Sequence, residues 1–191
     1  MNGLISLLLL SQTYQVVGGE VAYWTRVKSG FGLIAHTVTA VNRDVTGEVT
    51  LQKGRVQGTL YIPVVRFQSS NTQRDKDVAE ILEYQKYPYI LAQVLAPLDT
   101  LAPPETIDAT LTLRVKEEEH SFQVPVWIEQ RQDTVVARVE FSTRYTEVGL
   151  EPPYVKGIGF LGRAVSQAQD TLVLKGTLKF KEVVPWPSYG L

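Results

Sequence analysis

Apolar and polar residues alternate with a period of two over most of this 191-residue chain, and this alternation constrains its fold more than any other feature. The pattern is clearest in residues 45–52, 107–115, 122–129, 135–141 and 172–181. A β-strand turns successive side chains to opposite faces, so a strand with one buried face produces this alternation. The sequence therefore predicts half-buried antiparallel strands with one face in a core and the other in water.

Short polar turns separate these strands, at Lys53-Gly54, at 116–120 and at 131–133. Several strands at spacings of about ten residues are typical of an up-and-down sandwich or barrel, which the pattern alone does not separate. Long strands joined by short hairpins in neighbour order favour a closed barrel, because closure removes exposed strand edges. The length fits one all-β domain, and no internal repeat or low-complexity linker divides the chain.

Composition excludes several classes of function. The 19 basic and 20 acidic residues nearly cancel, so the sequence shows no surface for nucleic acid or for an anionic membrane. The absence of cysteine removes disulfides and thiolate chemistry, and His36 and His120 are the only histidines. We therefore expect no metal site built on several histidines of one chain and no cofactor.

The N-terminal residues are open to two interpretations. Leu4–Leu10 is an apolar run of the minimum length for a signal-peptide core and is too short to span a bilayer. No basic residue precedes the run, and no A-x-A cleavage pattern follows it. Four consecutive leucines favour a secretory or anchoring segment, and hence a periplasmic or otherwise extracytoplasmic protein. The alternative is a first strand or an extra apolar segment packed on the body. We expect an extension over 1–13, a barrel domain over 14–182 and a tail over 183–191.

One stretch, residues 71–88, interrupts the strand pattern. Thr72 and Asp75 have the spacing of a capping box, and Pro88 prevents the helix from continuing. The sequence predicts a short helix over about 74–84 that packs an apolar side on the barrel through Val78, Ala79, Ile81 and Leu82. Such a helix either acts as a gate for the interior or only covers the core.

The same stretch carries a family resemblance. Its pattern S-x-x-x-R-D followed by L-x-x-x-K-Y-P resembles the central signature of the YceI-like, polyisoprenoid-binding, lipocalin-like proteins. The matching residues are Ser70, Arg74, Asp75, Leu82, Lys86, Tyr87 and Pro88. Further stretches resemble the family in the correct order, namely 20–32, 45–51, 108–126 and 141–157. The resemblance covers roughly residues 14–181.

The resemblance implies an eight-stranded antiparallel, lipocalin-like barrel whose interior channel holds an isoprenoid lipid, and it implies no catalytic residue set. Three departures weaken the transfer of ligand contacts. Asp108-Ala109 replaces a glycine-rich strand entry, residues 114–122 lack the common G-x-T hairpin, and Val148 replaces the aromatic residue usual before Gly149. The alternative is a barrel with a filled interior that acts as an extracytoplasmic interaction or stress-response protein without ligand. Whether two barrels pair as a homodimer stays open.

The alternation assigns the residues expected to face the channel. They are Val21, Tyr23, Val49, Leu51, Leu60, Ile62, Leu111, Leu113, Phe122, Val124, Val139, Phe141, Leu172 and Leu174. Four more residues are candidates for the mouth: His36 and Arg74 for a ligand head group, and Ile81 and Leu82 for a lid. Structural alternatives are a strand position for His36, and an Arg74–Asp75 pair that holds the helix start to a strand end.

Enzyme signatures are weak. No G-x-S-x-G elbow accompanies the histidines, and residues 159–163 lack the lysine and spacing of a phosphate loop. The acidic residues visible in the pattern lie on solvated faces, which does not favour paired-carboxylate chemistry. The sequence thus favours non-enzymatic binding of a long apolar lipid.

Overall fold

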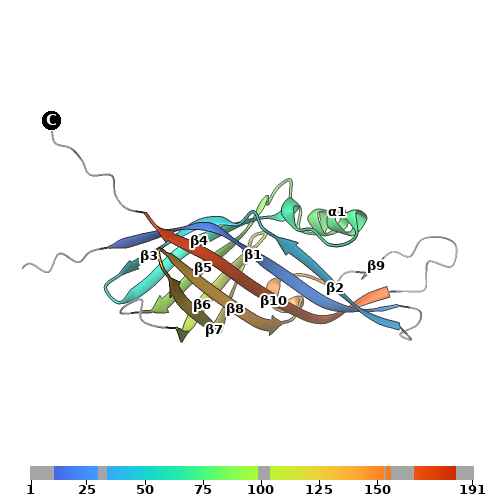
Figure 1. The fold of residues 1–191 in the computed structure, drawn as a ribbon. Coiled ribbons are helices and arrows are strands. Elements are labelled where there is room, and N and C mark those ends of the chain that lie inside the picture. The colour runs from blue at the N-terminus through green and yellow to red at the C-terminus, as the bar shows by residue number, and fades with distance from the viewer. Residues whose placement is uncertain (1–10, 30–33, 99–103, 153, 156–165, 184–191) are drawn as a thin grey trace, which may run out of the picture.

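The computed structural model describes residues 11–29, 34–98, 104–152, 154–155 and 166–183 (Figure 1). Within these ranges the chain is built mostly of strands, with one α-helix and two short 3₁₀ helices. The strands are β1 (Gln12–Ser29), β2 (Ile34–Asn42), β3 (Thr46–Gln52), β4 (Arg55–Pro63), β5 (Tyr89–Pro97), β6 (Glu105–Val115), β7 (Glu118–Arg131), β8 (Thr134–Thr143), β9 (Tyr154–Val155) and β10 (Ser166–Glu182). The helices are η1 (Val64–Arg66), α1 (Thr72–Ile81) and η2 (Thr146–Val148).

Eight of these strands close into an antiparallel barrel. The order β1-β3-β4-β5-β6-β7-β8-β10 is hydrogen-bonded from neighbour to neighbour, and β10 pairs with β1 to complete the ring. β2 pairs with β1 as an extra strand outside this ring, and the short β9 pairs with β10. The all-β, eight-stranded barrel with one short helix predicted from the sequence is confirmed.

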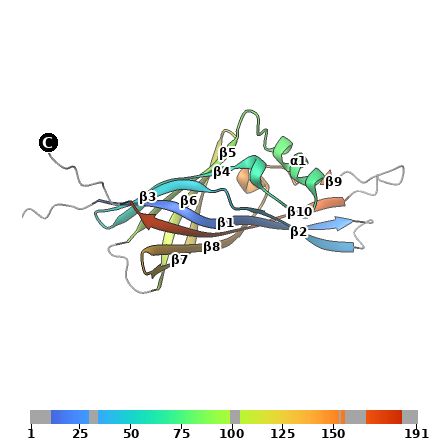
Figure 2. The ribbon, with the colours of Figure 1, turned by 45° about the horizontal axis from the view of Figure 1, so that its top comes forward.

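The first strand changes partner halfway along its length. β1 pairs with β3 over Gln12–Gln15 and with β2 over Val21–Ser29, while β10 accompanies it on its other side. Gly19 lies between the two halves with a φ of 120°, and a Cβ there would overlap the Thr177 carbonyl oxygen of β10. Only glycine adopts that conformation and that close approach without strain. β1, β2 and β10 extend past the rest of the barrel (Figures 1 and 2).

The hairpin turns are tight. Lys53 and Gly54 both have positive φ between β3 and β4, as a two-residue turn that matches strand twist requires. The turn between β6 and β7 is shorter than the predicted tip at 116–120, because β7 already begins at Glu118. These short connections keep successive strands adjacent around the ring.

Helix α1 starts earlier and ends earlier than the predicted span of 74–84. Its N-cap is Asn71, whose side-chain oxygen accepts the backbone N–H groups of Gln73 at 3.0 Å and Arg74 at 3.1 Å. The predicted capping box of Thr72 and Asp75 is therefore wrong. Asn71 is a strong cap one residue upstream, and the Asp75 carboxylate instead accepts the backbone N–H of Ser69 at 3.0 Å.

The helix lies in the connection between β4 and β5 and covers that end of the barrel (Figure 2). Ala79 and Leu82 are buried and Val78 is half-buried, as the apolar face predicted. Ile81 is 41% exposed, so it packs inward only in part. No helix among the described residues is long and apolar enough to cross a membrane.

The start of the barrel can be placed at Gln12. Gln12 and Thr13, which we expected in the N-terminal extension, pair with Leu51 and Thr50 of β3. Leu4–Leu10 and the tail from residue 184 lie outside the described residues, so the interpretation of the N-terminal run stays a prediction.

Candidate functional site: an apolar cavity inside the barrel

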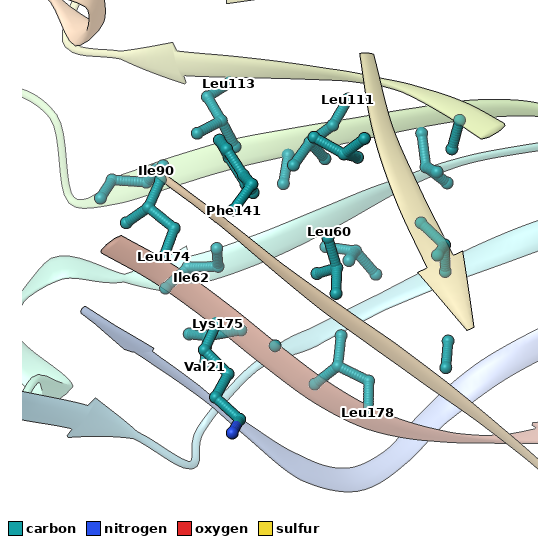
Figure 3. Close-up of a pocket in the computed structure, with 18 of the residues that line it drawn as sticks. Val21, Leu60, Ile62, Ile90, Leu111, Leu113, Phe141, Leu174, Lys175 and Leu178 are labelled. Carbon is teal, nitrogen blue, oxygen red and sulfur yellow. The ribbon is translucent and has the colours of Figure 1, made fainter. Parts of the chain in front are cut away.

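A cavity of about 290 Å³ lies inside the barrel and receives side chains from all eight strands of the ring. Figure 3 shows Leu60, Leu111 and Leu178, from three different strands, directed into the same space. Strand β1 follows the cavity from Tyr14 to Tyr23, which are roughly 30 Å apart along the strand at 3.3 Å per residue. The cavity is therefore long and narrow.

The wall is almost entirely apolar. Arg138, Lys175 and Glu151 are the charged residues on it, and all three are exposed. The Lys175 ammonium pairs with Glu140 at 3.3 Å, and the Arg138 guanidinium lies 4.4 Å from the centre of the Trp127 ring. These contacts hold the Lys175 and Arg138 charges on the outer face, so the interior offers a ligand mainly hydrocarbon surface.

The structure places the predicted channel residues on this wall with one exception. The residues found there are Val21, Tyr23, Val49, Leu51, Leu60, Ile62, Leu111, Leu113, Val124, Val139, Phe141, Leu172 and Leu174. The strand register that the alternation predicts is thus confirmed, since a one-residue slip would have turned these side chains outward. Their contact with a ligand stays a prediction.

Phe122 is the exception. It pairs with Leu111 and so faces the same side of the sheet, but it does not line the cavity. Its ring packs against Phe141 with centroids 5.2 Å apart and an interplanar angle of 42°. Phe122 therefore supports the wall through Phe141 and does not reach the open space.

The wall also contains residues that the sequence analysis did not assign to it, and two groups of them are instructive. Strand β5 contributes Ile90, Ala92, Val94 and Ala96, whose alternation was visible in the sequence and could have been used. The segment around η2 contributes Tyr145, Val148 and Leu150. No periodic signal marks this second group, because it folds as a short turn-like helix and an irregular loop.

Two tyrosines stand at the helix end of the cavity. Burial raises the pKa of the Tyr23 phenol well above its usual value, with smaller raising contributions from Tyr145 and Asp75 and a lowering one from Arg74. Burial also raises the pKa of Tyr145, which a hydrogen bond with Thr25 partly offsets. Both phenols are therefore neutral at physiological pH.

The four candidate mouth residues fall into two groups. Ile81 and Leu82 line the cavity from the helix side, as predicted. His36 and Arg74 do not line it: His36 is exposed on β2 opposite Val27, and Arg74 is half-buried in α1. His36 lies on β2, which pairs with β1 outside the eight-stranded ring, and its role toward a head group stays a prediction.

The connection that carries α1 is anchored to the extra strand. Gln68 and Val41 exchange two backbone hydrogen bonds of 2.9 Å, and Asp75 accepts the N–H of the adjacent Ser69. Of the predicted Arg74–Asp75 pair, the Asp75 carboxylate ties the helix start to the connection at Ser69. Arg74 contributes its backbone N–H to the cap.

An antiparallel eight-stranded ring around a narrow apolar space belongs to the class of small barrels that enclose one slender ligand or fill with side chains. The family model for the YceI-like domain matches residues 18–181. The chain belongs to the YceI-like family.

Solved structures with the same fold include a polyisoprenoid binding domain from Saccharophagus degradans implicated in plant cell wall breakdown. It is 14% identical, with a TM-score of 0.67, and the match covers 89% of this chain and 98% of that one. Burkholderia cenocepacia BcnA is also 14% identical, with a TM-score of 0.56 and coverage of 88% and 95%. At this identity the likeness shows the fold alone. A search of curated protein sequences gave no significant match.

Proposed function

We propose that this protein binds a polyisoprenoid, or a similarly long apolar lipid, in the barrel cavity and carries it without chemical conversion. The observation that carries the proposal is the long cavity with an almost purely hydrocarbon wall. Membership of the YceI-like family supports it, as does the polyisoprenoid binding described for the Saccharophagus degradans domain of the same fold.

The hydrophobic effect is large enough for useful affinity. Burial contributes about 0.8 kcal/mol per methylene, or roughly 3–4 kcal/mol for each five-carbon prenyl unit. Association costs several kcal/mol, and micromolar affinity corresponds to about −8 kcal/mol. A few prenyl units inside the cavity are therefore sufficient, and no ionic contact with the ligand is needed.

The shape of the cavity favours a chain over a compact ligand. Its wall runs from Tyr14 to Tyr23 along β1, and small residues such as Ala92, Ala96 and Ala109 leave the space between the larger side chains. The alternative of a filled barrel requires those side chains to meet across the centre. A cavity of about 290 Å³ favours the ligand-binding function over that alternative.

Native mass spectrometry of protein purified without detergent tests the proposal. We expect an added mass that organic solvent extracts and that contains a long prenyl or acyl chain. Ala92→Phe fills the cavity from β5 and should abolish this occupancy. The matched control is Gln93→Phe, which adds the same ring one residue further on the exposed outer face. Equal occupancy in both variants, or a protein that never carries lipid, would contradict the proposal.

We propose further that the protein works outside the cytoplasm, with Leu4–Leu10 as part of an export or anchoring segment. The apolar run supports this proposal. Cell fractionation of the expressed chain, compared with a variant in which Leu7 and Leu9 are replaced by Asp, tests it. Loss of the extracytoplasmic fraction in the variant is the expected result. Cytoplasmic location of both forms would contradict it.

A further inference from the structure

A second hollow, of about 1010 Å³, lies on the outer face of the barrel over β1 and β3–β6. Gly47 and Gly58 form part of its floor, at strand positions opposite Leu60 and Val49. Gly47 has a φ of 136°, and a Cβ there would overlap the Thr59 carbonyl oxygen of the neighbouring strand. We call this hollow the outer groove.

The outer groove carries little charge. Its polar lining consists of hydroxyl and carboxamide side chains, and Glu48 is its single charged residue. The outer face of β8 and β10 differs, because ion pairs such as Lys175–Glu140 at 3.3 Å and Lys181–Asp133 at 2.6 Å cover it. Solvent-facing surface usually mixes both signs of charge. The outer groove instead presents uncharged polar groups, which suit an uncharged polar ligand.

Strand register arranges these polar side chains in rows across the sheet. One row runs from Glu48 through Thr59 and Gln93 to Thr112, each directly opposite the next. A second row beside it runs through Thr50, Gln57, Leu95 and Thr110. Four strands span roughly 14 Å at 4.8 Å per spacing. The rows thus offer an extended molecule hydrogen-bonding groups along its whole length.

Hydrogen bonds within the protein hold two hydroxyl groups of this surface in place. Gln123 of β7 donates from its Nε2 to the Thr110 Oγ1 at 2.9 Å, which leaves the Thr110 hydroxyl proton available as a donor. Thr112 and the Ser121 hydroxyl share a hydrogen bond of 2.8 Å. Hydrogen bonds from β7 therefore hold hydroxyl groups of β6 in place at the border of the groove.

An exposed aromatic side chain stands at one end of the groove. The Tyr61 ring is 43% exposed and meets the Tyr89 ring edge-on, with centroids 6.1 Å apart and an interplanar angle of 86°. Tyr89 thus limits the movement of the Tyr61 ring. A rigid aromatic face presents apolar area at little entropic cost, and its hydroxyl adds a polar contact.

We propose that the outer groove binds a neutral oligosaccharide. Sugar hydroxyls both donate and accept hydrogen bonds, which matches threonine hydroxyls and glutamine carboxamides. Sugars also have an apolar C–H face, which can pack on the exposed ring of Tyr61 and on the exposed side chain of Leu95. A charged ligand finds no opposite charge there apart from Glu48. A second copy of the chain fits less well, because the centre of a stable protein interface is more apolar than this lining.

Isothermal titration calorimetry with cellohexaose, mannohexaose and maltohexaose tests the proposal on the full chain. We expect at least one of them to bind. Gln93→Ala and Tyr61→Ala should each weaken that binding about tenfold, the change expected from losing one good contact. Lys179→Ala, on the exposed face of β10, is the control and should leave the affinity unchanged.

Three results would overturn the proposal: no heat with any of the three sugars, equal affinity for an anionic hexagalacturonate, or unchanged affinity in both groove variants. A concentration-dependent dimer that Tyr61→Ala abolishes would also overturn it, since the groove would then be a self-association surface. Lipid occupancy of the inner cavity is measured separately on the same variants and should not change. Failure of the sugar site therefore leaves the lipid proposal untouched.

Discussion

The ring of Tyr23 packs against the ring of Phe67, with centroids 5.4 Å apart and an interplanar angle of 56°. Tyr23 belongs to β1, and Phe67 lies in the connection between η1 and α1. Both rings line the cavity. This contact therefore joins the barrel wall to the segment that carries the helix, and it fixes the helix end of the cavity.

Replacing Phe67 by alanine should destabilise the protein by about 3–5 kcal/mol, because the ring is only 9% exposed and its loss leaves a void. Urea unfolding followed by tryptophan fluorescence measures the change. Val65→Ala, in the adjacent 3₁₀ helix, is the control: Val65 is 53% exposed, so its truncation should change the free energy of unfolding by less than about 0.5 kcal/mol. Similar losses in both variants would show that the aromatic contact adds little.

The buried, neutral phenol of Tyr23 makes the free energy of unfolding depend on pH in the alkaline range. Burial raises its pKa in the folded protein above the ordinary value of about 10 that it has in the unfolded chain. Between these two pKa values the unfolded chain binds fewer protons, so stability falls as pH rises. The contribution is fully present below about pH 10 and is lost above it, by up to about 1.4 kcal/mol per pH unit.

Tyr23→Phe removes this titration and keeps the ring contact with Phe67. We expect the free energy of unfolding of the variant to fall less steeply than that of the parent above about pH 10. Urea unfolding at several alkaline pH values measures the two slopes, and their difference cancels the common titration of lysines. Parallel slopes would mean that the Tyr23 phenol is not protected from ionisation.

The start of α1 gives a sharp test of its cap. Asn71→Ala removes the acceptor for two backbone N–H groups and should cost about 1 kcal/mol. Thr72→Ala is the matched control: Thr72 is exposed and lies inside the helix, so its replacement by a better helix former should cost nothing. Urea unfolding measures both losses. If Thr72→Ala lowers the free energy of unfolding more than Asn71→Ala does, Thr72 is the cap instead.

The barrel and its inner face were predictable because the physical cause of the pattern is local. In a strand with one buried face, every second residue is apolar, as Leu111 and Leu113 are on β6. The sequence of the strand therefore shows which face is buried. The helix was predictable for the same reason, since its apolar residues recur at helical spacing. Its exact start was not, because Asn71 and Thr72 are both good caps and only the backbone geometry selects between them.

The rest depended on contacts between distant parts of the chain. Phe122 has the correct phase but packs against Phe141, and that contact joins two different strands, β7 and β8. Tyr145 and Val148 enter the wall from a short turn-like helix that has no period to detect. The change of partner along β1 at Gly19 likewise requires knowledge of both β2 and β3.

The last prediction concerns the role of α1 as a lid over the cavity. Leu82 is 6% exposed and lines the cavity from the helix side. Leu82→Ala should remove about 2–5 kcal/mol of packing between the helix and the barrel. A loss of only 1.4 kcal/mol from the closed state already favours opening about tenfold. We therefore expect a bound fluorescent prenyl alcohol to leave this variant about tenfold faster than the parent protein, measured by stopped-flow fluorescence.

The control for this prediction is Val27→Ala. Val27 is 2% exposed in β1 but does not line the cavity, so the substitution weakens the fold without changing the cavity wall. Release is compared at temperatures equally far below the melting temperature of each variant, which removes the effect of general destabilisation. If α1 gates the cavity, Leu82→Ala still releases the lipid faster than Val27→Ala. If both variants release it at the same rate, α1 only covers the core, and the ligand leaves by another opening of the barrel.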